Sequence, residues 1–262
     1  MPPPLSFDHL QALLRQYTAG LPDVRQPSPN TRYTIQNAAL GAFGIFFMQS
    51  PSFLEYQRQL HQCQGHDNAQ TLFGVEPIPC DNQIRTLRDP IAPHYFTPVF
   101  FEVFAHLEQQ RWLEPFRVLA QQLLVALDGT QYFSSQALHC RNCLTRQLSN
   151  GQTLSYHAAI PPVIVCPGHA QVIALAPAYI MPQDGHAKQD CEQAAGKRWM
   201  TQHAATLVPH HVTLLGDALY SKAPFCTWAL HQGFNFILVC KPASHPKLHI
   251  PTDLVVACIL TH

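Results

Sequence analysis

The chain is short of charge: only 12% of its residues are charged, and its formal net charge is zero. Disordered proteins combine much charge with few hydrophobic residues, and this sequence, 47% hydrophobic, is the opposite. Strong nucleic-acid binders are usually basic, so the charge balance argues mildly against a high affinity for DNA. The sixteen histidines soften that objection below about pH 6.5, where they begin to gain charge.

Other absences narrow the class of protein further. No hydrophobic run reaches the roughly 18 residues that a membrane-spanning helix needs, and the first residues show no secretory signal. The nine cysteines are odd in number, and several lie within hydrophobic runs, so they do not indicate a disulfide framework. We therefore expect a protein of the reducing cytoplasm with no membrane partner. Its 262 residues suit one large domain or two smaller ones.

Residues 1–120 are expected to form a helical N-terminal region. Ser6 is a candidate N-cap for a helix over residues 7–14, and the hydrophobic, alanine-rich residues 35–48 predict a buried helix. Such a module suits the recognition of DNA ends or dimerisation, which would make the protein a homo-oligomer. The alternative is a helical cap over the core of the next domain.

From residue 121 the pattern changes to strands that alternate with helices. Strands are expected at 123–127, 153–160, 162–166, 171–175, 212–215 and 234–240, and helices at 191–200 and 224–231. A hairpin followed by such an alternation is typical of a mixed sheet with helices packed against it. The sequence therefore predicts an α/β fold, with a core over residues 121–248 and a C-terminal tail over residues 249–262.

Two of these hydrophobic strands end on an aspartate. Asp128 follows the first strand, and Asp217 follows the strand at 212–215. If the two strands are neighbours, the carboxylates meet at one end of the sheet, where they suit a hard divalent cation such as Mg²⁺ or Mn²⁺. The alternative is ordinary: Asp-Gly is a turn signal by itself, and aspartates are common at strand ends.

A second cluster has the composition of a zinc site. His139, Cys140 and Cys143 lie close together in the sequence, and His157 follows. Two thiolates and two imidazoles can bind Zn²⁺ tetrahedrally. The adjacency of His139 and Cys140 makes joint ligation awkward, and the alternative is a reduced loop with a buried thiol.

Two further groups have weaker signals. Residues 182–192 place three acids, a histidine and a lysine before a helix, either as a substrate-positioning cluster or as helix-capping acids. Lys197, Arg198, Lys241 and His245 are candidate contacts to DNA phosphates, although solvated surface charge explains such residues equally well.

These features together resemble one family. The chain is similar to DDE-type bacterial insertion-sequence transposases, whose catalytic core is ribonuclease-H-like. The resemblance is carried by residues 46–54, 67–74, 128–135, 182–192, 197–199, 216–221 and 236–245. In a ribonuclease-H-like sheet the first and fourth strands are neighbours, which would bring Asp128 and Asp217 together.

The resemblance implies a function and a defect. Asp128 and Asp217 would be the first and second catalytic aspartates, ligating Mg²⁺ or Mn²⁺ for cleavage of transposon ends and their joining to target DNA. The family's third acid, a glutamate on a later helix, has no counterpart in residues 249–262, where Asp253 is the one carboxylate side chain. We therefore expect a C-terminally truncated transposase with a partial core and little independent activity. The alternatives are a non-catalytic DNA-binding or interfering fragment and a zinc-dependent hydrolase built on the cysteine–histidine cluster.

Overall fold

The computed structural model describes residues 5–26, 28–29, 31–63, 68–75, 79–182, 191–241, 245 and 256–260. It is a mixed α/β protein, as the sequence predicts, and it divides into two compact units, residues 1–110 and 111–262. The sequence-based boundary at residue 120 lies later, since residues 111–120 belong to the second unit. None of the described helices is long and hydrophobic enough to cross a membrane.

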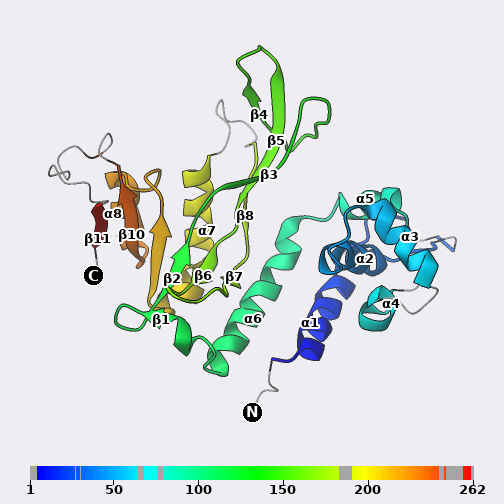
Figure 1. The fold of residues 1–262 in the computed structure, drawn as a ribbon, viewed down its shortest axis with the longest axis horizontal. Coiled ribbons are helices and arrows are strands. Elements are labelled where there is room, and N and C mark those ends of the chain that lie inside the picture. Colours follow the sequence, from blue (N-terminus) through cyan, green and yellow to red (C-terminus); the bar gives the residue numbers. More distant parts are fainter. Residues whose placement is uncertain are drawn as a thin grey trace. The chain divides into compact units, whose positions relative to one another are not determined.

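The described part of the first unit is helical. Its helices are α1 (Phe7–Ala19), α2 (Ile35–Phe47), α3 (Phe53–Cys63), α4 (Asn68–Phe73), α5 (Asp81–Arg88), the short η1 (Pro93–Phe96) and α6 (Thr97–Gln109) (Figure 1). Helix α2 lies at the centre, because its small residues Ala38 and Ala39 are buried and let neighbouring helices approach. The predicted cap is confirmed, since the Ser6 hydroxyl accepts a hydrogen bond from the His9 N–H at 3.2 Å.

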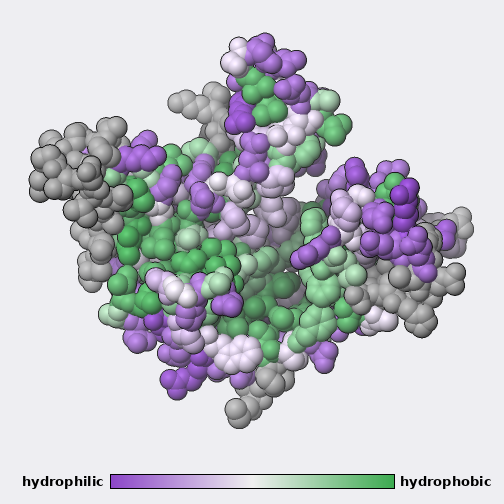
Figure 2. All heavy atoms as spheres, in the orientation of Figure 1, coloured by the Kyte–Doolittle hydropathy of each residue, from purple (hydrophilic) through white to green (hydrophobic). Residues whose placement is uncertain are grey.

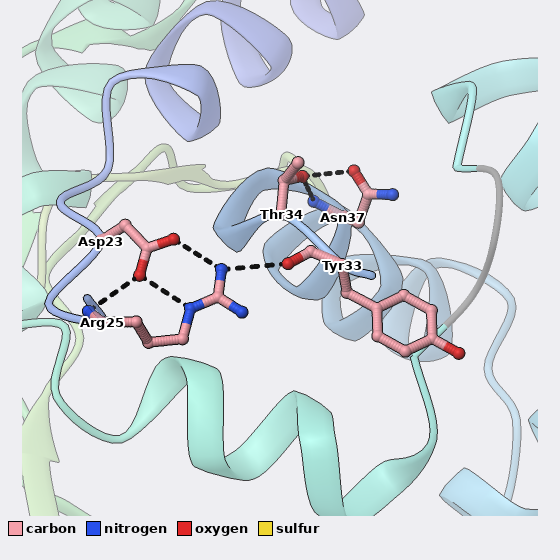
Figure 3. Close-up of polar contacts among 5 residues, drawn as sticks. All are labelled: Asp23, Arg25, Tyr33, Thr34 and Asn37. Carbon is pink, nitrogen blue, oxygen red and sulfur yellow. Dashed lines mark hydrogen bonds and ion pairs between the residues drawn. The ribbon is translucent and has the colours of Figure 1, made fainter. Parts of the chain in front are cut away.

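The loop between α1 and α2 is tied down by polar contacts (Figure 3). The Arg25 guanidinium donates to the Asp23 carboxylate at 2.8 Å and to the Tyr33 carbonyl at 3.0 Å. Thr34 then caps α2 by accepting a hydrogen bond from the Asn37 N–H at 3.0 Å. These hydrogen bonds therefore fix the conformation of the loop up to the start of α2.

The second unit contains two sheets. Its elements are η2 (Glu114–Phe116), β1 (Arg117–Val118), β2 (Gln122–Ala126), β3 (Thr130–Ser135), β4 (Leu144–Gln147), β5 (Thr153–Ile160), β6 (Val163–Val165), β7 (Ile173–Ala174), β8 (Ala178–Ile180), α7 (Glu192–Leu207), η3 (Val208–His210), β9 (Val212–Gly216), α8 (Ala223–His231), β10 (Asn235–Cys240) and β11 (Val256–Leu260).

The main sheet has the strand order β11-β10-β9-β2-β6-β7, with β1 added beside β2. Strands β2, β9 and β10 are parallel to one another, while β6, β7 and β11 pair antiparallel with their neighbours. Leu123, Val125 and Leu214 are fully buried, which explains the unbroken hydrophobic runs of β2 and β9. The predicted hairpin is present as β6 and β7, and residues 256–260 of the expected tail form the edge strand β11.

The smaller sheet continues the strands of the main one. Strand β3 follows β2 along the chain and β5 precedes β6, so the pairs β2–β6 and β3–β5 form one long hairpin. Strands β4 and β8 pair with successive parts of β5 on the side opposite β3, β4 with residues 153–156 and β8 with residues 158–160. In Figure 1 this part extends beyond the main sheet. We call residues 130–160, which contain β3, β4 and β5, the arm.

Candidate metal centres

Asp128 and Asp217 stand at corresponding positions on neighbouring strands. In the parallel pair β2–β9, Ala126 is opposite Leu215, and the ladder continues with the Leu127 N–H donating to the Leu215 carbonyl at 2.8 Å. Asp128 and Asp217 each follow two residues after that matched pair. The register therefore brings the two aspartates to the same end of the sheet, Asp128 two residues beyond β2 and Asp217 one residue beyond β9. Both are exposed.

A third carboxylate, that of Glu192, lies beside them. Glu192 is the first residue of α7 and is half-buried, and it accepts a hydrogen bond from the Gly129 N–H. A Cβ atom at position 129 would collide with the Glu192 carboxylate. Gly129 therefore allows the close approach of the Glu192 side chain. This contact explains the Asp-Gly pair better than a turn does, because the chain continues here directly from β2 into β3.

Tyr220 is buried in the core next to the Glu192 carboxylate. The turn after β9 is held by the Leu219 N–H, which donates to Asp217 Oδ1 at 2.8 Å. It places the Tyr220 ring in the core, 3.2 Å from where a Cβ atom of Gly196 would lie. Burial, followed by the neighbouring Glu192 carboxylate, raises the pKa of Tyr220. Helix α7 and the turn after β9 therefore pack against each other next to the acidic side chains.

The electrostatics of this carboxylate site favour a cation. The pKa of Glu192 is raised, first by burial and then by the negative charges of Asp217 and Asp128. A positive ion placed beside Glu192 would stabilise its ionised form. The carboxylate oxygens of the three acids do not all lie within 4.8 Å of one another. Among the described residues, one other group of three possible metal ligands is that compact.

That group is formed by Cys140, Cys143 and His157. The two Sγ atoms are 3.7 Å apart, and His157 Nε2 lies 3.4 Å from Cys140 Sγ and 3.5 Å from Cys143 Sγ. Backbone N–H groups point at the sulfurs, from Cys140 to Cys143 Sγ at 3.2 Å and from Asn142 to Cys140 Sγ at 3.3 Å. The three side chains could hold a metal ion.

The surroundings fix the three ligand side chains. The His157 ring stacks on Tyr132, with centroids 5.8 Å apart and planes 13° apart, and it also contacts Phe133. Cys143 is buried, and burial raises the pKa of its thiol. His139, the fourth ligand expected from the sequence, is exposed and is not a member of the group.

The candidate phosphate contacts make other interactions. The Lys197 ammonium lies over the rings of Trp228, at 5.3 Å, and Phe225, at 6.0 Å. Arg198 donates to the Tyr179 carbonyl at 3.4 Å, and His245 Nε2 lies 2.7 Å from the Ser221 carbonyl. The side chains of Lys197, Arg198 and His245 thus contact neighbouring residues of the second unit. Of the acidic cluster at 182–192, residues 183–190 lie outside the described part of the chain.

Sequence reasoning assigned Asp128 and Asp217 to one end of the sheet but left Glu192 as a capping or positioning acid. The one signal in the sequence was the position of Glu192 at the start of the helix that precedes β9. A single sequence does not show that the start of this helix packs on Gly129. A scan against protein-family models finds no match, and a comparison with curated proteins finds none either.

Proposed function

We propose that the second unit is a ribonuclease-H-like core that cleaves and joins DNA strands with a divalent metal, as a DDE-type transposase does. The observation that carries the proposal is that Asp128 and Asp217 follow the ends of adjacent parallel strands in matched register, with Glu192 near enough for both charges to raise its pKa. Acidic side chains at this place provide the oxygen ligands that Mg²⁺ and Mn²⁺ prefer.

The topology of the main sheet supports the same proposal. Apart from the two-residue β1, the main sheet begins with β2, β6 and β7, which form an antiparallel meander, and β9 and β10 then add parallel to β2 on its other side. This places the first strand beside the fourth, as the resemblance to a ribonuclease-H-like core requires. The order by itself defines a fold and not an activity.

The residues of the carboxylate site divide the work. Asp128 and Asp217 are exposed and would hold the cation, which supplies activation of the attacking oxygen and stabilisation of the leaving oxygen. Glu192 is half-buried and would complete the ligand set, ionising once the cation offsets its raised pKa. It supplies a third carboxylate from a helix that precedes β9, whereas the family's third acid lies on a later helix, so the proposal includes catalysis through this different set of acids.

A metal titration and a cleavage assay test this proposal. Asp128→Asn, Asp217→Asn and Glu192→Gln should each weaken Mn²⁺ binding at least tenfold, about 1.4 kcal/mol, and abolish nicking of DNA that carries transposon ends. Asp89→Asn is the matched control in the helical unit and should change neither. Wild-type protein that binds the DNA specifically but never nicks it in Mn²⁺ would instead favour a non-catalytic binding fragment.

For the cysteine–histidine group we propose a structural Zn²⁺. Zn–S bonds of about 2.3 Å and Zn–N bonds of about 2.0 Å at tetrahedral angles require S···S near 3.8 Å and S···N near 3.5 Å. The observed separations of 3.7, 3.4 and 3.5 Å meet this requirement. The N–H groups directed at the sulfurs stabilise thiolates.

Metal analysis of purified protein should find one zinc per chain, lost in Cys143→Ser and retained in the control Cys80→Ser, which changes an exposed thiol. Three protein ligands with an open position also describe a catalytic zinc site. Hydrolytic activity that depends on the zinc and survives Asp217→Asn would therefore favour the zinc hydrolase.

A further inference from the structure

The first unit contains a cavity between helix α5 and the loop that joins α1 to α2. Its volume is about 340 Å³, which lies within the range of small-molecule binding sites. The loop contributes Arg25, Arg32 and Tyr33 to the lining, and α5 contributes Gln83 and Leu87. Figure 2 shows the surface over α5 as mostly hydrophilic. The cavity can therefore accept a small molecule with polar groups.

Arg32 gives the cavity a positive charge. Its side chain is exposed, and its guanidinium lies over the Tyr33 ring at 5.2 Å. Arg32 forms no ion pair with any residue that the structure describes. No aspartate or glutamate is among the described residues that line the cavity. A concave site with a positive charge and no carboxylate in its lining attracts an anion.

The second arginine, Arg25, is held in one orientation by its neighbours (Figure 3). Its Nε donates to Asp23 Oδ1 at 2.8 Å, and its Nη2 donates to Asp23 Oδ2 at 2.5 Å and to the Tyr33 carbonyl at 3.0 Å. Asp23 offsets the charge of Arg25 but does not line the cavity. Nη1 has no acceptor within the described part of the chain. A donor fixed in this way loses little conformational entropy when it binds a ligand.

Polar side chains complete the lining from both walls. Gln83 of α5 and Thr31 of the loop are exposed, and neither side chain is hydrogen-bonded to a residue that the structure describes. An amide or a hydroxyl can donate a hydrogen bond to an anionic oxygen. A phosphate ester presents three such oxygens, whereas a carboxylate presents two. A phosphate group can therefore use donors from the loop and from α5 together.

We propose that this cavity binds a small phosphate ester. Arg32 and Nη1 of Arg25 contact the phosphate oxygens, and the Gln83 amide donates to them from α5. A small ester is favoured over DNA because the whole molecule can enter a cavity of about 340 Å³, whereas a duplex presents its phosphates on the outside of a wide rod. The inference goes beyond the proposed function, because it assigns a ligand to the helical unit and uses no residue of either metal centre.

Isothermal titration calorimetry of the full chain with adenosine 5′-monophosphate, without added divalent cation, tests the proposal. Adenosine, which lacks the phosphate, should bind about tenfold more weakly or not at all, and inorganic phosphate should compete with the monophosphate. Arg32→Gln should weaken binding of the monophosphate about tenfold, because it removes a charge-assisted contact. Gln83→Ala should weaken it several-fold, and Arg32→Lys, which keeps the charge, should retain part of the affinity.

Arg58→Gln is the matched control, because it removes an exposed arginine of the same unit that does not line the cavity. Equal losses in Arg32→Gln and Arg58→Gln, or equal binding of adenosine and its monophosphate, would overturn the proposal. So would binding of a 20-base-pair duplex with no binding of the monophosphate or of inorganic phosphate. Asp217→Asn should keep monophosphate binding, and Arg32→Gln should keep Mn²⁺ binding, so failure of this proposal is distinguishable from failure of the proposed catalysis.

Discussion

At the scale of single residues, Gly129 is the position on which the carboxylate site depends most. Gly129→Ala should displace Glu192, because the added methyl group would occupy the space of that carboxylate. We expect Mn²⁺ affinity to fall about tenfold while the fold is retained, as the clash is with the end of a flexible side chain. Calorimetric titration with Mn²⁺ measures the change. Gly20→Ala is the control, since a Cβ atom there meets ordinary contacts at 3.7 Å; unchanged Mn²⁺ binding by Gly129→Ala would show that Glu192 is no part of the site.

The same residue shows where sequence reasoning ends. The Asp-Gly pair is correctly marked as special, and the hydrophobic run before it correctly predicts a buried strand ending at a carboxylate. The reason for the glycine is a contact with residue 192, more than sixty positions away along the chain. Neither composition nor spacing reports such a contact, so Glu192 is found only when α7 is seen to pack beside β2.

At the scale of elements, buried strands are predictable and exposed ones are not. Strands β2, β9 and β10 and the hairpin β6–β7 follow from hydrophobic runs bounded by turn residues. Strands β3 and β4 carry mostly exposed polar residues and have no such signal. Strand β3 forms because it extends β2, which the main sheet already fixes, and β4 forms because β5 pairs with it.

Helix α7 contains a buried histidine that should make stability depend on pH. His203 packs on Trp199, with ring centroids 5.4 Å apart, and burial lowers its pKa to about 4 from 6.5. Between those two values the unfolded chain binds a proton that the folded chain does not. Stability should therefore fall by on the order of 2 kcal/mol as the pH drops from about 6.5 to about 4, and it should not change through this group above pH 6.5.

Urea unfolding at pH 7 and pH 5 measures this effect. His203→Gln should lose less stability between the two pH values than the wild type does, because glutamine does not titrate. His231→Gln, at an exposed position of α8, is the control and should behave as the wild type does. A wild-type-like loss in His203→Gln would assign the acid sensitivity to other groups.

At the scale of the whole molecule, charge is distributed unevenly. Of the four acids of the second unit that the structure describes, Glu114 forms an ion pair with Arg111, and Asp128, Glu192 and Asp217 belong to the carboxylate site. The arm between Asp128 and α7 has none. A net charge of zero therefore conceals an uneven distribution, with carboxylates gathered at one end of the main sheet and absent from the arm.

The division into two compact units predicts separate responses to metal. All three tryptophans, Trp112, Trp199 and Trp228, lie in the second unit, so tryptophan fluorescence reports that unit alone, whereas far-ultraviolet circular dichroism reports both. Mn²⁺ at about 100 times its Kd stabilises the unit that binds it by about 2.7 kcal/mol, which corresponds to a rise of about 5–10 °C in Tm for a domain of this size. We expect the fluorescence transition to shift by this amount and the helical transition of the first unit to stay in place, with Asp217→Asn removing the shift. A single transition that moves as a whole by both probes would show that the units unfold together, because metal bound to one would then stabilise the other equally.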